Sequence, residues 1–364
     1  MKALPWLIMF FGLAFFSCEA LADRVAPSDR VQTGLRIRSD PDVQSTIIGA
    51  LLPGQSLPLK SSVSGWYEVS LANGDAGFVS KSWARLIPDA APPIAASAEL
   101  RLGSWNIRKL GHGDNKNFPL VAEVIESHFD IVAVVEIMQK GGGHPGYDSL
   151  ISALGQGWNG IVTNQPRPNT SSGSAEFYAI LFRPQRVQLC DGWTDLRYAP
   201  DDGDVFSREP AFACFVTFTA DGSSGFDFLL AAYHARWADG DTVEIQDEVR
   251  NLDDVFAAMG ATRPGERDLL IAGDFNLVPV DLQETVSRPI STVGTGSTLN
   301  STGAVTSNVY DHLLVFDVTA THEQLEPARV LDVRHVAATN RTFFQTVSDH
   351  LPIVARFRII PDDD

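Results

Sequence analysis

Basic residues are scarce in this chain, which limits how it could hold a polyanion. Of its 364 residues, 28 are Lys or Arg and 45 are Asp or Glu, so the net charge is −17. Residues 23–98 hold seven basic and seven acidic residues and residues 1–22 also cancel, so the whole charge falls on residues 99–364. A region this acidic cannot hold nucleic acid by a broad basic surface. Bound metal and a few local cations would have to attract any phosphodiester.

Long apolar runs are also lacking, except at the N-terminus. Residues 1–22 combine a basic Lys2, an apolar core at 7–16 and a small-residue cleavage site at Ala20-Leu21-Ala22. This order is typical of a secretory signal peptide, and the core is too short to span a bilayer comfortably. A retained membrane anchor is the alternative. We expect an exported protein, periplasmic or secreted, that acts as a monomer without stable membrane insertion.

Cysteine is rare, so a framework of many disulfides is excluded. Loss of the signal peptide would take Cys18 and leave two of the three cysteines. Cys190 and Cys214 each lie in a strand-like stretch, 187–190 and 211–218, with a turn-rich loop between them. Neighbouring antiparallel strands could bring the two thiols together, and an oxidising compartment would allow a disulfide. Two unpaired buried thiols are the alternative.

The chain has no internal repeats and no low-complexity segment, but its length and turns indicate two domains. Residues 23–87 contain short strand-like runs broken by turns, the pattern of a small all-β domain. Residues 88–98 follow with three prolines and five alanines and predict a linker. A second, larger domain would then occupy residues 99–364.

Short strings within residues 24–87 resemble the bacterial SH3 domain. In chain order they are Arg38-Ser39, Ile48-Gly49, Pro53-Gly54-Gln55, Gly65-Trp66-Tyr67 and Gly77-Phe78-Val79-Ser80. The resemblance implies a small SH3-like barrel of a kind that often binds cell-wall peptides, so such a peptide is a candidate partner. Trp66 and Tyr67 are candidate recognition aromatics, although core packing is the favoured role for both.

Beyond residue 98, apolar strand-like runs alternate with amphipathic helices. The clearest helix begins at Asp241, whose side chain can cap it, and the pattern predicts that Gly260 ends it. Residues 291–307, rich in Gly, Ser and Thr, predict a mobile loop.

Polar side chains recur where these strand-like runs begin or end. A carboxylate at such a place is unfavourable unless a metal, a cation or a hydrogen-bond network compensates it. The positions are Asn106, Glu136, Glu176, His234, Asp274, Asn276, Asp311, Asp349 and His350. Any one of them alone is more often a solvated strand end or a satisfied core residue. Their joint occurrence indicates that they point into one pocket.

The strings around these positions resemble the endonuclease/exonuclease/phosphatase superfamily, whose best-known branch is deoxyribonuclease I. In family order they are Gly103-Ser104-Trp105-Asn106-Ile107, Val134-Val135-Glu136, Leu181-Phe182-Arg183-Pro184, Phe206-Ser207-Arg208-Glu209-Pro210, Tyr233-His234, Gly273-Asp274-Phe275-Asn276, Tyr310-Asp311 and Ser348-Asp349-His350. The resemblance covers essentially all of residues 99–360. It implies an α+β fold, a four-layer α/β/β/α sandwich in which helices flank two packed β-sheets.

A metal ion is part of what the resemblance implies. Hydrolysis of a phosphodiester needs a cation to neutralise charge, a base for water and an acid for the leaving oxygen. Glu136, with Asn106 and Asp349 nearby, would offer oxygen ligands that suit Mg²⁺. Mn²⁺ and Ca²⁺ are the alternatives.

The resemblance also implies the groups that move protons. His234 and His350 would pair with Glu176 and Asp311, which would fix the imidazole tautomers and raise their basicity. One histidine would protonate the leaving group, while the other, or Asp274, would orient or deprotonate water. Spacing alone does not assign these roles.

Phosphate binding and substrate choice depend on further positions. Asn276 and Arg208 would hold phosphate oxygens, Arg208 through its planar fork. The duplex-cutting branch of the family has an arginine two residues after the metal glutamate and a tyrosine two residues before the Glu176 equivalent. Met138 and Ser174 stand at these places, so grip on duplex DNA should be weaker.

The leading hypothesis is an exported Mg²⁺-dependent nuclease of the deoxyribonuclease I type. A sphingomyelinase or an inositol-phosphate phosphoesterase of the same fold is the runner-up, and no convincing hydrophobic hairpin for membranes supports it. A catalytically dead, cell-wall-binding protein is the alternative from another class, and the intact set of Asn, Glu, His and Asp residues argues against it. The choice between DNA and RNA, and between endo and exo cleavage, stays open.

Overall fold

The computed structural model describes residues 24–27, 31, 33–53, 55–63, 65–71, 74–81, 83–87, 99–113, 115–168, 175–219, 222–239, 241–294, 296–317 and 322–361. The predicted signal peptide and linker lie outside these residues. The chain divides into two compact units, Met1–Ala91 and Pro92–Asp364. No helix within the described ranges is both long enough and apolar enough to cross a membrane.

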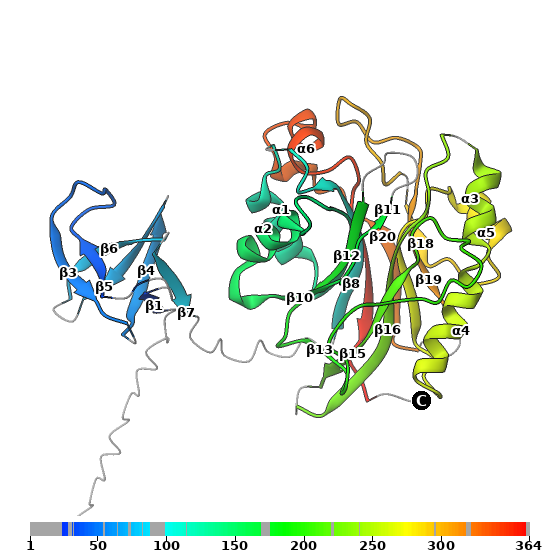
Figure 1. Cartoon of the computed structure of the whole chain (residues 1–364), viewed down its shortest axis with the longest axis horizontal. Helices are drawn as coiled ribbons and strands as arrows, with labels where there is room; N and C mark the ends of the chain where they lie inside the picture. The colour runs from blue at the N-terminus through cyan, green and yellow to red at the C-terminus, as the bar shows by residue number, and fades with distance from the viewer. Residues whose placement is uncertain are drawn as a thin grey trace, which may run out of the picture. The chain divides into compact units, whose positions relative to one another are not determined.

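The first unit is an antiparallel β structure (Figure 1). Its strands are β1 (Arg24–Pro27), β2 (Leu35–Arg38), β3 (Ile47–Leu51), β4 (Leu57–Val63), β5 (Trp66–Ser70), β6 (Ala76–Ser80) and β7 (Ala84–Ile87), in the order β3-β2-β6-β5-β4-β1-β7. Strand alternation explains which side chains enter the core. On β2, Leu35 and Ile37 are buried whereas Arg36 between them is exposed. The predicted small all-β domain is confirmed.

The second unit contains two β-sheets. One has the strand order β10-β12-β9-β8-β21-β20-β18, with β11 paired to β12, and the other has the order β13-β15-β16-β17-β19, with β14 paired to β15. The bounds in the first are β8 (Glu99–Leu110), β9 (Ile131–Met138), β10 (Asn159–Val162), β11 (Arg167–Pro168), β12 (Ala175–Phe182), β18 (Thr292–Val293), β20 (Gln324–Val330) and β21 (Ile353–Arg358). Those in the second are β13 (Val187–Leu189), β14 (Arg197–Tyr198), β15 (Ala211–Phe218), β16 (Ser224–His234), β17 (Leu269–Asp274) and β19 (Asp311–Val315).

Helices cover the outer faces of both sheets (Figure 1). The first sheet packs on α1 (Phe118–His128), α2 (Pro145–Leu154) and α6 (Asn340–Thr346), and the second packs on α3 (Thr242–Val249), α4 (Leu252–Thr262) and α5 (Pro279–Thr285). A third apolar cluster lies between the sheets, where Leu102, Val135, Leu230 and Leu270 meet from strands of both. Alternate residues of these central strands therefore enter different cores, which confirms the four-layer sandwich.

The predicted helix after Asp241 is right at its start and wrong at its end. Asp241 is the N-cap of α3, and its carboxylate accepts hydrogen bonds from the backbone N–H groups of Val243 and Glu244. The apolar pattern continues, but the helix breaks before α4, and Gly260 lies inside α4 rather than after it. Asn251 explains the break, because its side-chain amide donates to the carbonyls of Asp247 and Glu248 and so competes with the helical backbone.

The predicted mobile loop at residues 291–307 is buried over part of its length. Some of its described residues are packed: Ser297 is fully buried, and isolated bridges join Leu299 to Val305 and Thr298 to His350. The hydroxyl of Ser297 accepts hydrogen bonds from the backbone N–H groups at 310 and 311. The Ser297 hydroxyl therefore contacts the start of β19, which enters the site, whereas Ser301 and Thr302 are exposed to solvent.

Candidate active site

Strand register alone brings three of the predicted residues side by side. The parallel pairing of β16 with β17 sets His234 opposite Asp274, and the antiparallel pairing of β17 with β19 sets Asp274 opposite Asp311. All three side chains are at least nine-tenths buried. The second sheet therefore ends in a row of imidazole and carboxylate groups at one edge of the sandwich.

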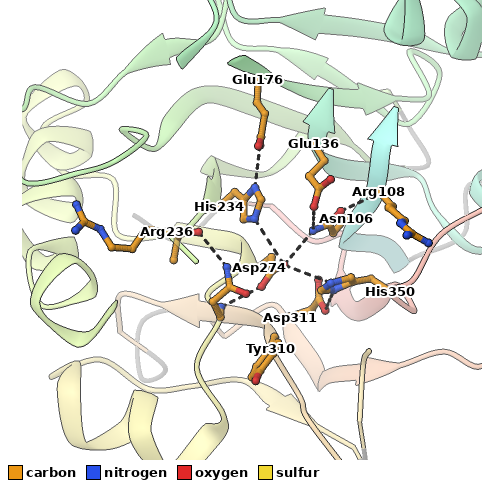
Figure 2. Close-up of polar contacts among 12 residues, drawn as sticks. Asn106, Arg108, Glu136, Glu176, His234, Arg236, Asp274, Tyr310, Asp311 and His350 are labelled. Carbon is orange, nitrogen blue, oxygen red and sulfur yellow. Dashed lines mark hydrogen bonds and ion pairs between the residues drawn. The ribbon is translucent and has the colours of Figure 1, made fainter. Parts of the chain in front are cut away.

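The first sheet supplies Asn106 from β8, Glu136 from β9 and Glu176 from β12. The side-chain amide of Asn106 donates to Oε1 of Glu136 and to Oδ2 of Asp274, each at 3.0 Å (Figure 2). Asn106 thus connects the two sheets through two carboxylates. Its own oxygen accepts a hydrogen bond from the backbone N–H of Arg108 at 2.9 Å.

Two histidine–carboxylate pairs face each other across Asp274 (Figure 2). Nδ1 of His234 lies 2.9 Å from Oε2 of Glu176, and Nδ1 of His350 lies 2.8 Å from Oδ2 of Asp311. Both predicted pairings are confirmed. The Nε2 atoms lie 3.8 Å and 3.6 Å, respectively, from the same oxygen, Oδ2 of Asp274.

The charges around these histidines change their pKa values. Burial by itself would lower the pKa of His350, but Asp311 and Asp274 outweigh burial and raise it well above its ordinary value. The pKa of His234 is raised as well, because Glu176 and Asp274 outweigh the opposing effects of burial and of the Arg208 guanidinium. Both imidazoles therefore hold a proton more firmly than a free histidine does.

Several carboxylate oxygens at this edge suit a cation. Asp274, Asp311 and His350 offer ligand atoms within 4.8 Å of one another. One carboxylate oxygen of Asp311 and one of Asp349 are buried without a hydrogen-bond partner in the described part of the chain. Buried oxygens of this kind call for a partner, and hard oxygen donors are what Mg²⁺ binds. The residues present therefore fit a divalent ion.

Two of the site residues predicted from the sequence have strained backbones. Glu136 has a φ of 62° and Asn276 a φ of 50°, in the left-handed region that non-glycine residues seldom adopt. The turn at Asn276 lets its backbone N–H donate to Oδ1 of Asp274 and its side-chain amide donate to the carbonyl of Ala235, each at 3.0 Å. Strain of this kind is typical of functional sites whose surroundings hold it in place.

A cavity of about 500 Å³ brings most of the predicted residues together. Its lining includes Glu136, Glu176, Arg208, His234, Asp274, Asn276 and His350. Asn106 and Asp311 are hydrogen-bonded to lining residues. Asp349 precedes the lining residue His350 in the chain, and its Oδ2 lies 3.2 Å from Nε of Arg108.

The guanidinium of Arg208 is buried and already hydrogen-bonded to backbone groups of the protein. It is 1% exposed, and it donates to the carbonyls of His234 at 3.1 Å and Ala235 at 2.6 Å. Its NH1 lies 3.8 Å from Oε1 of Glu176. These contacts fix the end of β16 and the carboxylate beside His234, and the role of Arg208 in holding phosphate stays a prediction.

The structure also brings in residues that the sequence did not single out as site residues. Lys109, Trp237 and Tyr310 line the same cavity, and the Trp237 and Tyr310 rings lie 6.3 Å apart. Trp237 is 46% exposed. The hydrophobic periodicity of strands and helices gives no signal for Trp237. Its position three residues after His234, a predicted site residue, could have identified it as a candidate.

Met138 and Ser174 are the two positions predicted to weaken binding of duplex DNA, and the structure describes only the first. Met138 lines the cavity, is 2% exposed and pairs across the sheet with Glu176. Ser174 lies outside the described residues.

Comparison with known families agrees with this geometry. Residues 103–350 match the Endonuclease/Exonuclease/phosphatase family over more than half of the chain. The chain belongs to this family. Residues 33–84 match the bacterial SH3 domain, as predicted.

Individual members of the endonuclease/exonuclease/phosphatase family resemble the chain to different degrees. A protein named deoxyribonuclease, from Thioalkalivibrio sp. (strain K90mix), is 36% identical over 231 residues, which is 61% of this chain and 60% of that protein. The chain therefore spans less than two thirds of the length of that relative.

Two solved structures of family members show the shared fold. The endonuclease/exonuclease/phosphatase from Bacteroides vulgatus has a TM-score of 0.50 and 17% identity, covering 72% of this chain and 99% of its own. A family protein from Bacteroides thetaiotaomicron has a TM-score of 0.51 and 18% identity, covering 71% of this chain and 94% of its own.

Proposed function

We propose that the protein is an exported, divalent-metal-dependent phosphodiesterase that hydrolyses nucleic acid. The observation that carries the proposal is the convergence of two histidine–carboxylate pairs on one oxygen of Asp274. Hydrolysis of a phosphodiester needs both a proton donor and a group that directs water, and the two sides of Asp274 offer one position for each. Membership of the family and the 36% identical relative named deoxyribonuclease support the choice of substrate.

Metal binding is assigned to Glu136 and Asp349, as the family resemblance implies. Oε2 of Glu136 accepts a hydrogen bond from the backbone N–H of Lys109 at 2.8 Å, and Oδ1 of Asp349 is buried without a hydrogen-bond partner in the described part of the chain. A divalent ion there supplies neutralisation of the phosphate charge. Asn106 holds the carboxylates of Glu136 and Asp274 in register through its amide. In this arrangement the side-chain nitrogen of Asn106, rather than its oxygen, faces the two carboxylates. The role of Asn106 as a direct metal ligand stays a prediction.

Proton transfer falls to the two histidines. A proton on Nδ1 of each is fixed by hydrogen bonding to Glu176 or Asp311, which leaves Nε2 to give or take a proton at the substrate. Raised pKa values favour the protonated form, which a donor to the leaving oxygen needs. Asp274 accepts hydrogen bonds at both oxygens and is placed to orient the attacking water.

Aromatic side chains support a nucleic-acid substrate. Trp237 is the only aromatic residue with an exposed side chain in the described part of the catalytic unit. An exposed indole at the cavity mouth can stack on any base without reading its sequence. Lys109, exposed on the same lining, adds a cation in a unit that carries the whole net charge of −17.

The disulfide supports export. Cys190, the residue that follows β13, and Cys214, on the paired strand β15, are bonded in the structure, with Cα atoms 5.3 Å apart. Disulfides persist in oxidising compartments such as the periplasm or the extracellular medium.

The test is an activity screen with protein purified from an exporting host. Plasmid, single-stranded DNA, RNA and sphingomyelin would be offered with Mg²⁺ and, in parallel, with a chelator. We expect hydrolysis of at least one nucleic acid that the chelator abolishes and that Asp274→Asn removes. Hydrolysis of sphingomyelin alone, or of nothing, would overturn the proposal, provided that circular dichroism shows a folded protein.

A further inference from the structure

A second hollow, of about 400 Å³, lies on the SH3-like unit. Four of its lining side chains are Arg36, Arg38, Trp66 and Trp83, and we call the hollow that they form the Trp-Arg groove. Trp83 is 52% exposed. Trp66 was expected to pack in the core, and its place on this surface corrects that expectation.

Strand geometry explains why these residues share one surface. Arg36 and Arg38 are two apart on β2, so they leave the same face while Leu35 and Ile37 enter the core. On the neighbouring strands, Arg38 pairs with Phe78, and Ser80, two residues further along β6, pairs with Trp66 on β5. The antiparallel register thus sets Arg36, Ser80 and Trp66 level with one another across three strands.

The two arginines are not neutralised. Arg36 is exposed and makes no ion pair or side-chain hydrogen bond in the described structure. Arg38 makes one side-chain hydrogen bond in the described structure, from NH1 to the carbonyl of Ser45 at 2.6 Å. No carboxylate is among the described residues that line the groove, and Glu68, on the same face, forms an ion pair with Lys60 at 3.0 Å. The Trp-Arg groove is therefore cationic within a unit whose formal charge is zero.

We propose that the Trp-Arg groove binds single-stranded nucleic acid and holds it for the catalytic unit, an inference that rests on the proposed function. Indole rings offer stacking surfaces for bases of any sequence, and guanidinium forks bind phosphate oxygens in pairs. The catalytic unit repels a polyanion through its charge of −17, whereas this unit does not. Because both units belong to one chain, binding at the groove raises the effective concentration of the strand at the active site.

A single strand fits the groove better than a cell-wall peptide does. Two uncompensated cations beside two aromatic rings match a ligand that repeats negative charge and flat rings along its length. A short peptide could offer carboxylates to the arginines, but it has no regular partner for both indoles.

The test measures binding without hydrolysis. Full-length exported protein in chelator would be titrated with labelled oligothymidylate, and anisotropy would be followed across a salt series. In Arg36→Ala/Arg38→Ala, we expect the slope of log K against log salt to become shallower by about 1.4, because about 0.7 is lost for each phosphate contact on a single strand. In Trp83→Ala, we expect affinity to fall by about tenfold through lost stacking.

The matched control is Arg341→Ala/Arg358→Ala. It removes the same charge from two exposed arginines of the catalytic unit that make no side-chain ion pair in the described structure. An equal loss of binding in this control and in the groove variant would mean that net charge alone acts, and the proposal would fail. It would also fail if the groove variant lost retention on purified peptidoglycan but kept its oligothymidylate affinity. Since no hydrolysis is read, these outcomes are independent of whether the catalytic proposal holds.

Discussion

Nδ1 of His350 lies 2.8 Å from Oδ2 of Asp311, and the arrangement is repeated at His234 and Glu176 at 2.9 Å. The two pairs come from different parts of the sandwich, since Glu176 belongs to the first sheet and Asp311 to the second. Both present Nε2 to the same oxygen of Asp274. Two similar pairs around one carboxylate allow one histidine to give a proton while the other stabilises charge.

Removing either histidine should therefore remove a proton-transfer group. We expect His234→Ala and His350→Ala each to slow hydrolysis by at least roughly a hundredfold, the usual scale for a lost general acid or base. The measurement is kcat at saturating Mg²⁺, with His335→Ala, an exposed histidine that does not line the cavity, as control. A loss under about tenfold would take that histidine out of the proton path.

Coupling within a pair gives a sharper readout. If Glu176 acts through His234, then Glu176→Ala combined with His234→Ala should cost much less than the two separate losses summed. Simple additivity of the two losses would show that Glu176 acts independently of the imidazole.

The metal role of Glu136 can be separated from folding. We expect Glu136→Gln to abolish Mg²⁺-dependent hydrolysis while leaving the fold intact. Without added ion, the variant should melt at the same or a slightly higher temperature, because Glu136 and Asp274 repel each other across Asn106. Scanning calorimetry in chelator would show this, with Glu123→Gln on the exposed face of α1 as control. Unchanged turnover at saturating Mg²⁺ would contradict the role.

The raised histidine pKa values predict how stability depends on pH in metal-free protein. The folded pKa values of His234 and His350 exceed the unfolded value of about 6.5, so their contribution is complete below that pH. It is lost as pH rises through the folded values. Urea unfolding in chelator should therefore show the free energy of unfolding falling as pH is raised above neutrality. His234→Gln/His350→Gln should flatten this dependence, and a rise with pH in the wild type that the variant lacks would refute it.

The disulfide predicts a difference between oxidised and reduced protein. Protein from an exporting host should have both Cys190 and Cys214 blocked to alkylation until it is reduced. Replacing both by alanine should cost about 2–4 kcal/mol of unfolding free energy, the usual range for a single bond. Arg263 donates to both sulfur atoms, at 3.0 Å and 2.8 Å, so its packing would be disturbed as well. Two alkylatable thiols in the folded, exported protein would contradict the bond.

The sequence predicts which residues end the strands of this site, but not how the strands bring those residues together. Apolar runs that end in polar residues predicted the strand ends at His234, Asp274 and Asp311, because burial penalises a carboxylate there. Their adjacency follows from strand register, which the pattern of one strand cannot give. The pairing of His350 with Asp311 came from family resemblance, since 39 residues separate them. The burial of Ser297 within residues 291–307 was missed because hydroxyl-rich segments look alike whether they face water or backbone groups.

Trp237 gives the most direct test of substrate class. Because its exposed ring stands at the cavity mouth beside Tyr310, Trp237→Ala should raise KM for a polynucleotide by about tenfold through the loss of one stacked base. A small phosphodiester without bases, such as bis(p-nitrophenyl) phosphate, cannot place a nucleobase on the indole, so its KM should change much less. Trp237→Phe keeps a flat ring and should restore most of the polynucleotide KM, which a merely structural role for the indole would not require. Equal rises for both substrates in Trp237→Ala, without rescue by phenylalanine, would mean that the ring supports the loop rather than the substrate.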